Sequence, residues 1–188
     1  IIQQMLNLSR ARAPERTELD LSRVIKDALV FLEYQVERSK VQVIEHLAPE
    51  LPLIKGDGDG LQQVLINLIL NALQAMPDGG GLTLSSRAEH RRKEGLDLVP
   101  PQQFVVVEIQ DRGVGIPESE QSRIFEPFYS TKRRGEGTGL GLTVAHGIVK
   151  EHDGWIEVER AEPRGCIFRV YLPSEEQEAS GATDKRDA

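Results

Sequence analysis

The sequence alternates segments of helical periodicity with short runs of β-branched and apolar residues, and this alternation restricts the fold more than any other feature. Helices are predicted over about 20–39, with Asp20 as N-cap, over 61–76 and over 139–152. The predicted strands are 41–44, 82–85, 104–109, 155–159 and 166–172. Helices interleaved with hairpin-forming strands favour an α+β or α/β sandwich, with the helices on one face of a mixed sheet.

The remaining segments are predicted to be turns and loops. The glycine-rich run at 56–60 is typical of a turn, the charged, proline-containing segment 89–103 of a loop, and 112–138 of a long polar loop. Residues 1–12 carry apolar side chains at near-helical spacing and indicate the end of a longer helix, which Pro14 terminates. The start of the chain, which is not Met, is typical of a cut inside a longer protein.

Charge and cysteine content exclude several classes of protein. Lys and Arg number 23 against 30 Asp and Glu, and the net charge of −7 argues against a surface that coats nucleic acid. A single cysteine, Cys166, allows neither an internal disulfide nor a cysteine metal cluster, and indicates the reducing cytosol. Apolar runs fall short of the roughly 18 residues that span a bilayer.

Two asparagines lie four residues apart in the predicted helix 61–76, at Asn67 and Asn71. This spacing places both side chains on one side of the helix, about 40° apart around its axis. Asparagine is a middling helix former, so two of them beside an apolar face indicate a task for their carboxamides. The alternative is a pair of structural polar residues.

The segment DRGVGIP at 111–117 follows a predicted strand. By strand alternation Asp111 shares a face with Ile109 and the valines before it, where a carboxylate needs hydrogen-bond donors. Gly113 and Gly115 allow a flat ligand to approach the backbone, and an amino-bearing heterocycle such as adenine would satisfy the acid. A glycine-rich turn with a local aspartate bond is the alternative.

The segment GEGTGLGL at 135–142 opens the last predicted helix. Glycines beside the free N–H groups of a helix start form a cradle for phosphates, although the spacing matches neither a P-loop nor a dinucleotide fingerprint. Before it stands IFEPFYSTK at 124–132, whose aromatic residues in a polar loop indicate a movable lid, with Lys132 available to a phosphate. Alternatively, Phe125 and Phe128 fix this loop in the core.

Four features of the chain closely resemble, in the same order, the N, G1, F and G2 boxes of two-component sensor histidine kinases. They are the two asparagines, the DRGVGIP segment, the IFEPFYSTK segment and the GEGTGLGL segment. These kinases share an ATPase superfamily with DNA gyrase and MutL. The resemblance covers about residues 20–173, and the wording of 56–76 and 124–132 is most similar to the nitrogen-regulation branch.

The resemblance implies a fold of the Bergerat ATP-binding type. This is an α+β fold, a two-layer α/β sandwich in which helices pack on one face of a mixed sheet and a mobile lid covers ATP. It divides the chain into residues 1–13, the end of a helical dimerisation and phosphotransfer hairpin, residues 14–173, the catalytic ATP-binding domain, and residues 174–188, a disordered tail.

The resemblance also implies roles for individual residues. Asn71 would hold Mg²⁺ and thereby the phosphates, with Asn67 and Lys132 beside them as catalytic residues, and Asp111 would bind the adenine amino group. The residues implied to bind ATP are Asn67, Asn71, Asp111, Gly113, Gly115, Ile116, Phe125, Thr131, Lys132, Gly137, Thr138, Gly139, Leu140, Gly141 and Leu142. Among these, the glycines at 113 and 115 would line the base pocket, and those from 137 to 141 would form a hinge and phosphate cradle.

One position distinguishes phosphoryl transfer to a protein from hydrolysis of ATP. The hydrolysing relatives carry a glutamate that activates water where this chain has Asn67, and an amide is a poor proton acceptor at neutral pH. The resemblance therefore implies transfer of the ATP γ-phosphoryl group to a protein histidine, and relay to the aspartate of a response-regulator receiver domain. The alternatives are a related ATPase that hydrolyses ATP, and a non-catalytic nucleotide-binding module.

The phosphoacceptor is expected upstream, because the chain's own histidines, His46, His90, His146 and His152, stand outside the acceptor motif of the kinases. The implied partners are thus the hairpin of the same protein, a receiver domain and a second copy in a homodimer, without nucleic acid. The whole protein is expected in the cytoplasm, with membrane anchoring left open.

Two positions depart from the family pattern. Cys166 replaces a threonine whose hydroxyl would support Asp111 through water, and Gln74 replaces a lysine that many relatives place near the phosphates.

Overall fold

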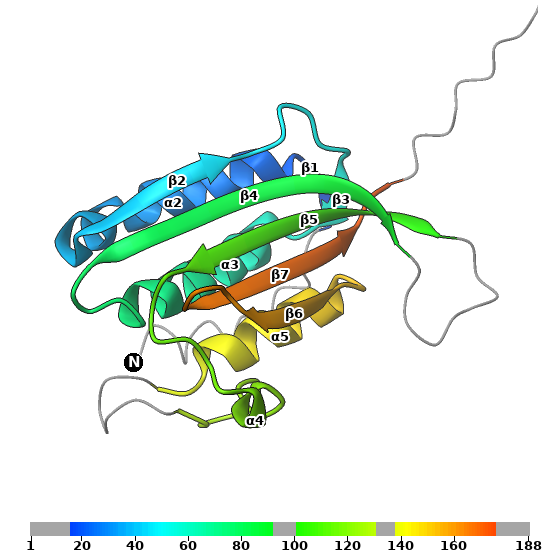
Figure 1. Cartoon of the computed structure of the whole chain (residues 1–188). Coiled ribbons are helices and arrows are strands. Elements are labelled where there is room, and N and C mark those ends of the chain that lie inside the picture. Colours follow the sequence, from blue (N-terminus) through cyan, green and yellow to red (C-terminus); the bar gives the residue numbers. More distant parts are fainter. Residues whose placement is uncertain (1–15, 92–100, 131–137, 176–188) are drawn as a thin grey trace, which may run out of the picture.

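The computed structural model describes residues 16–91, 101–130 and 138–175, and shows a sheet covered by helices on one face only (Figure 1). The strands are β1 (Thr17–Leu19), β2 (Val41–His46), β3 (Ile54–Gly56), β4 (Gly80–Arg91), β5 (Gln102–Asp111), β6 (Trp155–Arg160) and β7 (Cys166–Pro173). The helices are α2 (Leu21–Ser39), α3 (Gly58–Gln74), α4 (Glu118–Gln121) and α5 (Gly141–Glu151).

The main sheet is mixed and has the order β2-β4-β5-β7-β6. Strand β2 runs parallel to β4, and the remaining neighbours are antiparallel. In Figure 1 the sheet faces the viewer, and α2, α3 and α5 lie behind it. The main core fills the space between these helices and the sheet. The predicted two-layer α/β sandwich is confirmed.

The starts of α2 and α3 are set by aspartate caps. Asp20 caps α2 as predicted, since its Oδ1 accepts the backbone N–H of Ser22 at 2.9 Å. Asp57 caps α3 in the same way, accepting from the N–H of Asp59 at 3.2 Å. The helix therefore begins at Gly58, three residues before the predicted start, and part of the predicted turn 56–60 is its first turn.

The predicted loop 89–103 is wrong at both ends. Strand β4 continues to Arg91 and β5 begins at Gln102, so His90 lies in a strand and not in a loop. Residues 92–100 lie outside the described part. Ion pairs between strands support the extension, for example Arg91 to Glu157 at 2.9 Å. The two-stranded antiparallel sheet of β1 and β3 was not predicted.

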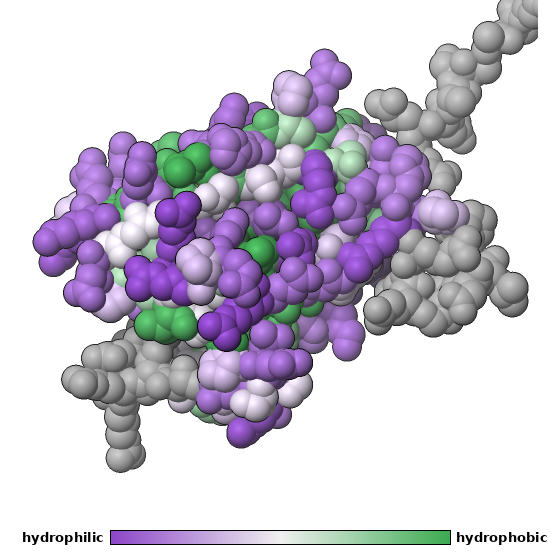
Figure 2. All heavy atoms as spheres, viewed as in Figure 1, coloured by the Kyte–Doolittle hydropathy of each residue, from purple (hydrophilic) through white to green (hydrophobic). Residues whose placement is uncertain are grey.

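The sheet face away from the helices carries an aromatic cluster under polar side chains. Trp155 stacks on Tyr171 with ring centroids 4.5 Å apart, and Phe104 meets Trp155 edge-on at 4.8 Å. Arg91 lies over the Tyr171 ring, and Glu157 accepts hydrogen bonds from Trp155 and Tyr171. Figure 2 shows this face, where hydrophilic residues dominate. Long polar side chains shield the aromatic rings on this face from water, so the face needs no second layer of helices to cover it.

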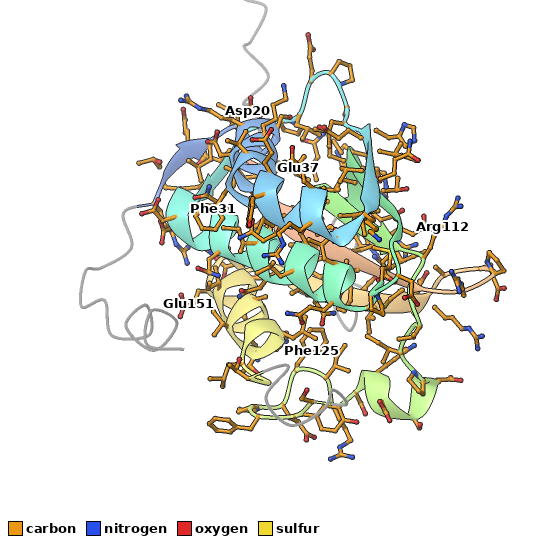
Figure 3. All side chains as sticks on the ribbon, turned by 90° about the vertical axis from the view of Figure 1, so that its left-hand side faces the viewer. Asp20, Phe31, Glu37, Arg112, Phe125 and Glu151 are labelled. Atoms are coloured by element: carbon orange, nitrogen blue, oxygen red, sulfur yellow. The ribbon has the colours of Figure 1, made fainter. Side chains whose placement is uncertain are left out.

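The segment entering the domain is fastened to the end of α5. The Arg16 guanidinium donates to the carbonyl oxygen of Glu151 and lies 3.6 Å from the Asp153 carboxylate. Glu151, labelled in Figure 3, is the last residue of α5, where a cation is favourable. Residues 1–13, the predicted end of a hairpin, lie outside the described residues, as do 176–188 of the predicted tail. Within the described ranges, no helix has the length and apolar character needed to cross a membrane.

Candidate nucleotide-binding site

Asp111 is the last residue of β5, and its side chain is only 2% exposed. Strand alternation directs it to the helix-covered side, together with the core residues Val107 and Ile109, as predicted. Its Oδ1 accepts the backbone N–H of Gly113 at 2.8 Å. Burial raises the pKa of Asp111 above its ordinary value, and the backbone N–H groups of Gly113 and Cys166 oppose that shift. A carboxylate accepts up to four hydrogen bonds, so these two donors orient it without exhausting it.

The turn after Asp111 packs against the end of α3. A Cβ at Gly113 would lie 2.5 Å from the carbonyl oxygen of Ala75, so only glycine permits this approach. The Val114 N–H donates to the same oxygen at 3.3 Å. Gly115 lies against Gly165, and Ile116 is half-buried against the core. The G1-like segment is thereby fixed one turn beyond Asn71 in α3.

Asn67 connects α3 to the start of α5. It is 8% exposed, and its Nδ2 donates to the carbonyl oxygen of Gly141 at 3.0 Å. Its Oδ1 accepts from Nε2 of Gln63, one turn earlier in α3, at 2.9 Å. Asn71 is half-buried one turn further along the same side of the helix. Asn67, the first of the two asparagines, is therefore in direct contact with the glycine-rich helix start, although Gly141 lies 74 residues further along the chain.

Phe125 lies beside α5, as Figure 3 shows, at the end of that helix away from Glu151. Its ring stacks on His146 of α5 with centroids 5.0 Å apart. Burial and, to a smaller extent, the charge of Lys150 lower the pKa of His146, which favours the neutral ring in this contact.

For Phe128 the alternative given above, an anchor in the core, is wrong. Phe128 is 76% exposed, and its backbone φ of +65° lies in the left-handed region, which is uncommon for a residue with a bulky side chain. Tyr129, the next residue, packs against the core in its place. The Phe128 N–H donates to the carbonyl oxygen of Gly139 at 3.0 Å, so the F-like and G2-like segments touch through their backbones.

Gly139 must be glycine at this contact. Its φ is +66°, and a Cβ would lie 2.6 Å from the carbonyl carbon of Phe128. Thr138 is exposed and its hydroxyl accepts from the Leu140 N–H at 3.3 Å, while Leu142 packs against the core. Gly141 begins α5, two residues after the predicted start of that helix.

Three predicted site residues, Thr131, Lys132 and Gly137, lie outside the described residues, and so does the end of the predicted lid from residue 131 on. Most described members of the predicted set lie on α3, at the end of β5 and at the start of α5, three elements that the contacts above connect. In the described ranges no three His, Cys, Asp or Glu side chains lie where they could hold a metal ion. A magnesium ion here would use an amide oxygen, water and phosphate oxygens, a donor set that Mg²⁺ accepts.

The replacement of the family's threonine by Cys166 places a buried thiol beside Asp111. Cys166 is 3% exposed, and burial together with the nearby Asp111 charge raises the pKa of its thiol to about 12. Its support of Asp111 comes from its backbone N–H, which any residue other than proline would supply at this position. Gln74 is exposed at the last position of α3 and forms contacts of its own.

Two side chains that connect these elements by hydrogen bonds were not predicted. Gln63 could have been noticed from its four-residue spacing to Asn67, which places both amides on one side of α3. His152, predicted on the last helix, is its C-cap residue and is 5% exposed; its contact with the N-cap of α3 has no signal in the sequence because the partners are 95 residues apart.

The fold is a two-layer sandwich. In it, a buried carboxylate at a strand end and a helix that carries two asparagines adjoin a glycine-rich helix start. This arrangement defines an ATP-binding domain of the ATPase class. Residues 56–176 match the family model described as "Histidine kinase-, DNA gyrase B-, and HSP90-like ATPase". The chain belongs to this family.

Curated relatives of the chain are sensor kinases. It is 37% identical over 188 residues to the sensor kinase CckA of Brucella abortus (strain 2308), covering 97% of this chain and 20% of that protein. It is 36% identical over 173 residues to sporulation kinase E of Bacillus subtilis (strain 168), covering 92% of this chain and 22% of that protein. The chain thus spans about a fifth of the length of these relatives.

Solved structures agree with the family. The catalytic domain of histidine kinase ThkA matches with a TM-score of 0.69 and 29% identity, over 85% of this chain and 96% of that domain. ThkA in complex with the response regulator protein TrrA matches with a TM-score of 0.71 and 26% identity, over 93% of this chain and 46% of that one. The fold is that of histidine kinase catalytic domains.

Proposed function

We propose that this chain is the catalytic, ATP-binding part of a sensor histidine kinase. The observation that carries the proposal is the buried Asp111 carboxylate at the end of β5, oriented by the Gly113 N–H. A buried acceptor with spare capacity recognises the exocyclic amino group of adenine, and guanine presents a carbonyl oxygen at the equivalent place.

The phosphates are assigned to the other end of the site. The start of α5 supplies N–H groups and a favourable dipole for anions, and Asn67 adjoins it. Asn71 would hold Mg²⁺, which when bound neutralises phosphate charge. Thr131, Lys132 and Gly137 belong to the same assignment from the sequence alone.

Transfer to a histidine is favoured over hydrolysis by the state of Asn67. Its amide is hydrogen-bonded at both ends and cannot take a proton from water at neutral pH. A histidine nitrogen needs no such base, because it attacks the γ-phosphorus through a lone pair while the bond to the β–γ bridging oxygen breaks. Phosphoryl transfer then depends mainly on positioning and charge.

The partners follow from this reaction. The acceptor histidine would lie on a hairpin preceding the catalytic domain in the same protein, which would be a homodimer, and the phosphoryl group would pass to a receiver domain. The solved ThkA complex contains a response regulator protein, which supports the last assignment. The cytoplasm stays the predicted compartment.

Calorimetric titration with ATP and GTP tests the base pocket. We expect the wild-type chain to prefer ATP, and Asp111→Asn to lose about 1–3 kcal/mol of ATP binding, because the new amide presents a donor or a weaker acceptor to the adenine amino group. Unchanged ATP affinity in this variant would refute the assignment of Asp111.

A further inference from the structure

Gln63 belongs to a short relay of side-chain amides that ends on the backbone of α5. Its Nε2 donates to Oδ1 of Asn67 at 2.9 Å, and Nδ2 of Asn67 donates to the carbonyl oxygen of Gly141 at 3.0 Å. Gln63 is half-buried and Asn67 is 8% exposed, so water competes weakly for these bonds. The two bonds connect the middle of α3 to the first residue of the last helix.

The direction of the relay is fixed at its Gly141 end. An amide can be turned over, but a backbone carbonyl oxygen only accepts. Gly141 therefore requires Nδ2 of Asn67, which leaves Oδ1 facing Gln63 and requires a donor there. Turning the Asn67 amide over would oppose two oxygens at Gly141 and two NH₂ groups at Gln63. The Gln63 donor thus supports the orientation of Asn67 that Gly141 sets, and a side chain without a donor at position 63 would leave Oδ1 of Asn67 without this partner.

We propose that Gln63 is a positioning residue of the phosphate end of the site, acting through Asn67. The inference rests on the proposed function, in which Asn67 and the start of α5 lie beside the ATP phosphates. Gln63 holds the Asn67 amide in one orientation and thereby holds α5 against α3 before ATP arrives. Preorganised groups bind a charged ligand without first being reordered, so loss of the Gln63 donor weakens contacts to the phosphates and leaves the base pocket at Asp111 intact.

Gln63→Met tests this with a matched control. Methionine keeps the length and helix propensity of glutamine but has no donor. Gln62 is also half-buried, lines a groove beside α2 instead, and provides the control Gln62→Met. We expect Gln63→Met to weaken ATP binding with Mg²⁺ by about tenfold, as expected for one lost buried hydrogen bond. Gln62→Met should stay within about twofold of wild type.

Adenosine, followed by NMR titration, separates positioning from general stability. It carries the base without phosphates, so Gln63→Met should bind it within about twofold of wild type. Equal losses for ATP and adenosine would overturn the proposal, because they would indicate a disturbed fold. So would ATP binding by Gln63→Met that equals that of Gln62→Met.

A double variant tests the route through Asn67. In an Asn67→Ala background, Gln63→Met should cause little further loss of ATP binding, and an additive loss would overturn the proposal. If Gln63→Met does not fold, Gln63→Glu at pH 7.5 replaces it, since the isosteric carboxylate offers only acceptors to Oδ1 of Asn67. Should the wild-type chain itself not bind ATP, the proposed function fails, whereas normal ATP binding by both Gln63 variants contradicts only the role of Gln63.

Discussion

The buried ring of His152 accepts the backbone N–H of Asp57 at Nε2 across 2.9 Å, and its Nδ1 lies 2.7 Å from the carbonyl oxygen of Ile148. The carbonyl only accepts, so Nδ1 carries the proton and the ring is neutral. This one side chain joins the end of α5 to the N-cap of α3, the two helices that carry the glycine-rich start and the asparagines. A Cβ at Gly56 would lie 2.8 Å from the same ring, so its surroundings leave no spare room.

His152→Ala should therefore destabilise the domain. It removes the acceptor of a buried N–H and leaves a cavity, which together cost about 2–4 kcal/mol in the free energy of unfolding. Urea unfolding followed by circular dichroism measures the loss. His90→Ala, at an exposed position of β4, is the control and should stay within about 0.5 kcal/mol of wild type. Equal stabilities of the two variants would contradict the role of His152.

Cys166 should be unreactive in the native state. Because the pKa of its thiol is raised to about 12, the thiolate is scarce at pH 8, and the side chain is buried. As the chain has a single cysteine, a thiol-reactive disulfide reagent should give one equivalent of colour in urea and almost none, over the same time, without it. Rapid stoichiometric labelling of the folded chain would show that the surroundings of Cys166 are open to solvent and would contradict this prediction.

Asp111→Asn should raise the stability of the free protein at neutral pH. The pKa of Asp111 is raised by burial, so the native state binds its proton more tightly than the unfolded state does. Stability from this group is present at low pH and is lost as the pH rises through the native pKa. The variant's advantage should thus be full at pH 7 and shrink toward pH 4. Thermal unfolding across this range measures it, and a destabilised variant at pH 7 would contradict the prediction.

Asn71→Ala should remove the part of ATP binding that depends on metal. In wild type, chelation of Mg²⁺ with EDTA should weaken ATP binding by about tenfold or more, since the phosphates then lack their counter-charge. The variant should bind ATP equally with and without EDTA, at the affinity of chelated wild type. An equal loss of binding in both conditions would rule out Asn71 as the metal ligand.

Local signals in the sequence predicted much of the fold. The Asp20 cap, the apolar face of α3 and the alternation before Asp111 each depend on neighbouring residues, and the structure has all three. The missed features depend on distant partners. Strands β1 and β3 pair residues that lie 35 to 39 positions apart, and the end of β4 is held by Arg91 against Glu157 of β6.

The candidate site shows the same division. The motifs of the site were found because each consists of residues close together in the sequence. The contacts between the motifs were not found. The sequence contains no sign that Asn67 contacts Gly141 or that His146 stacks on Phe125, since these contacts exist only after α3, the loop and α5 pack together. Phe128 was misplaced because an aromatic residue normally indicates burial, whereas here it is exposed, with a left-handed backbone that the sequence does not announce.

The central claim, that this domain transfers phosphoryl groups to a histidine outside the chain, is tested most directly with γ-labelled ATP. The chain is incubated with and without the hairpin domain of its parent protein, and the products are treated with acid or base. We predict label on the hairpin only, stable in base and lost in acid, as phosphohistidine requires, with slow release of free phosphate in its absence. Rapid phosphate release without the hairpin, or stable label on the chain itself, would contradict the account.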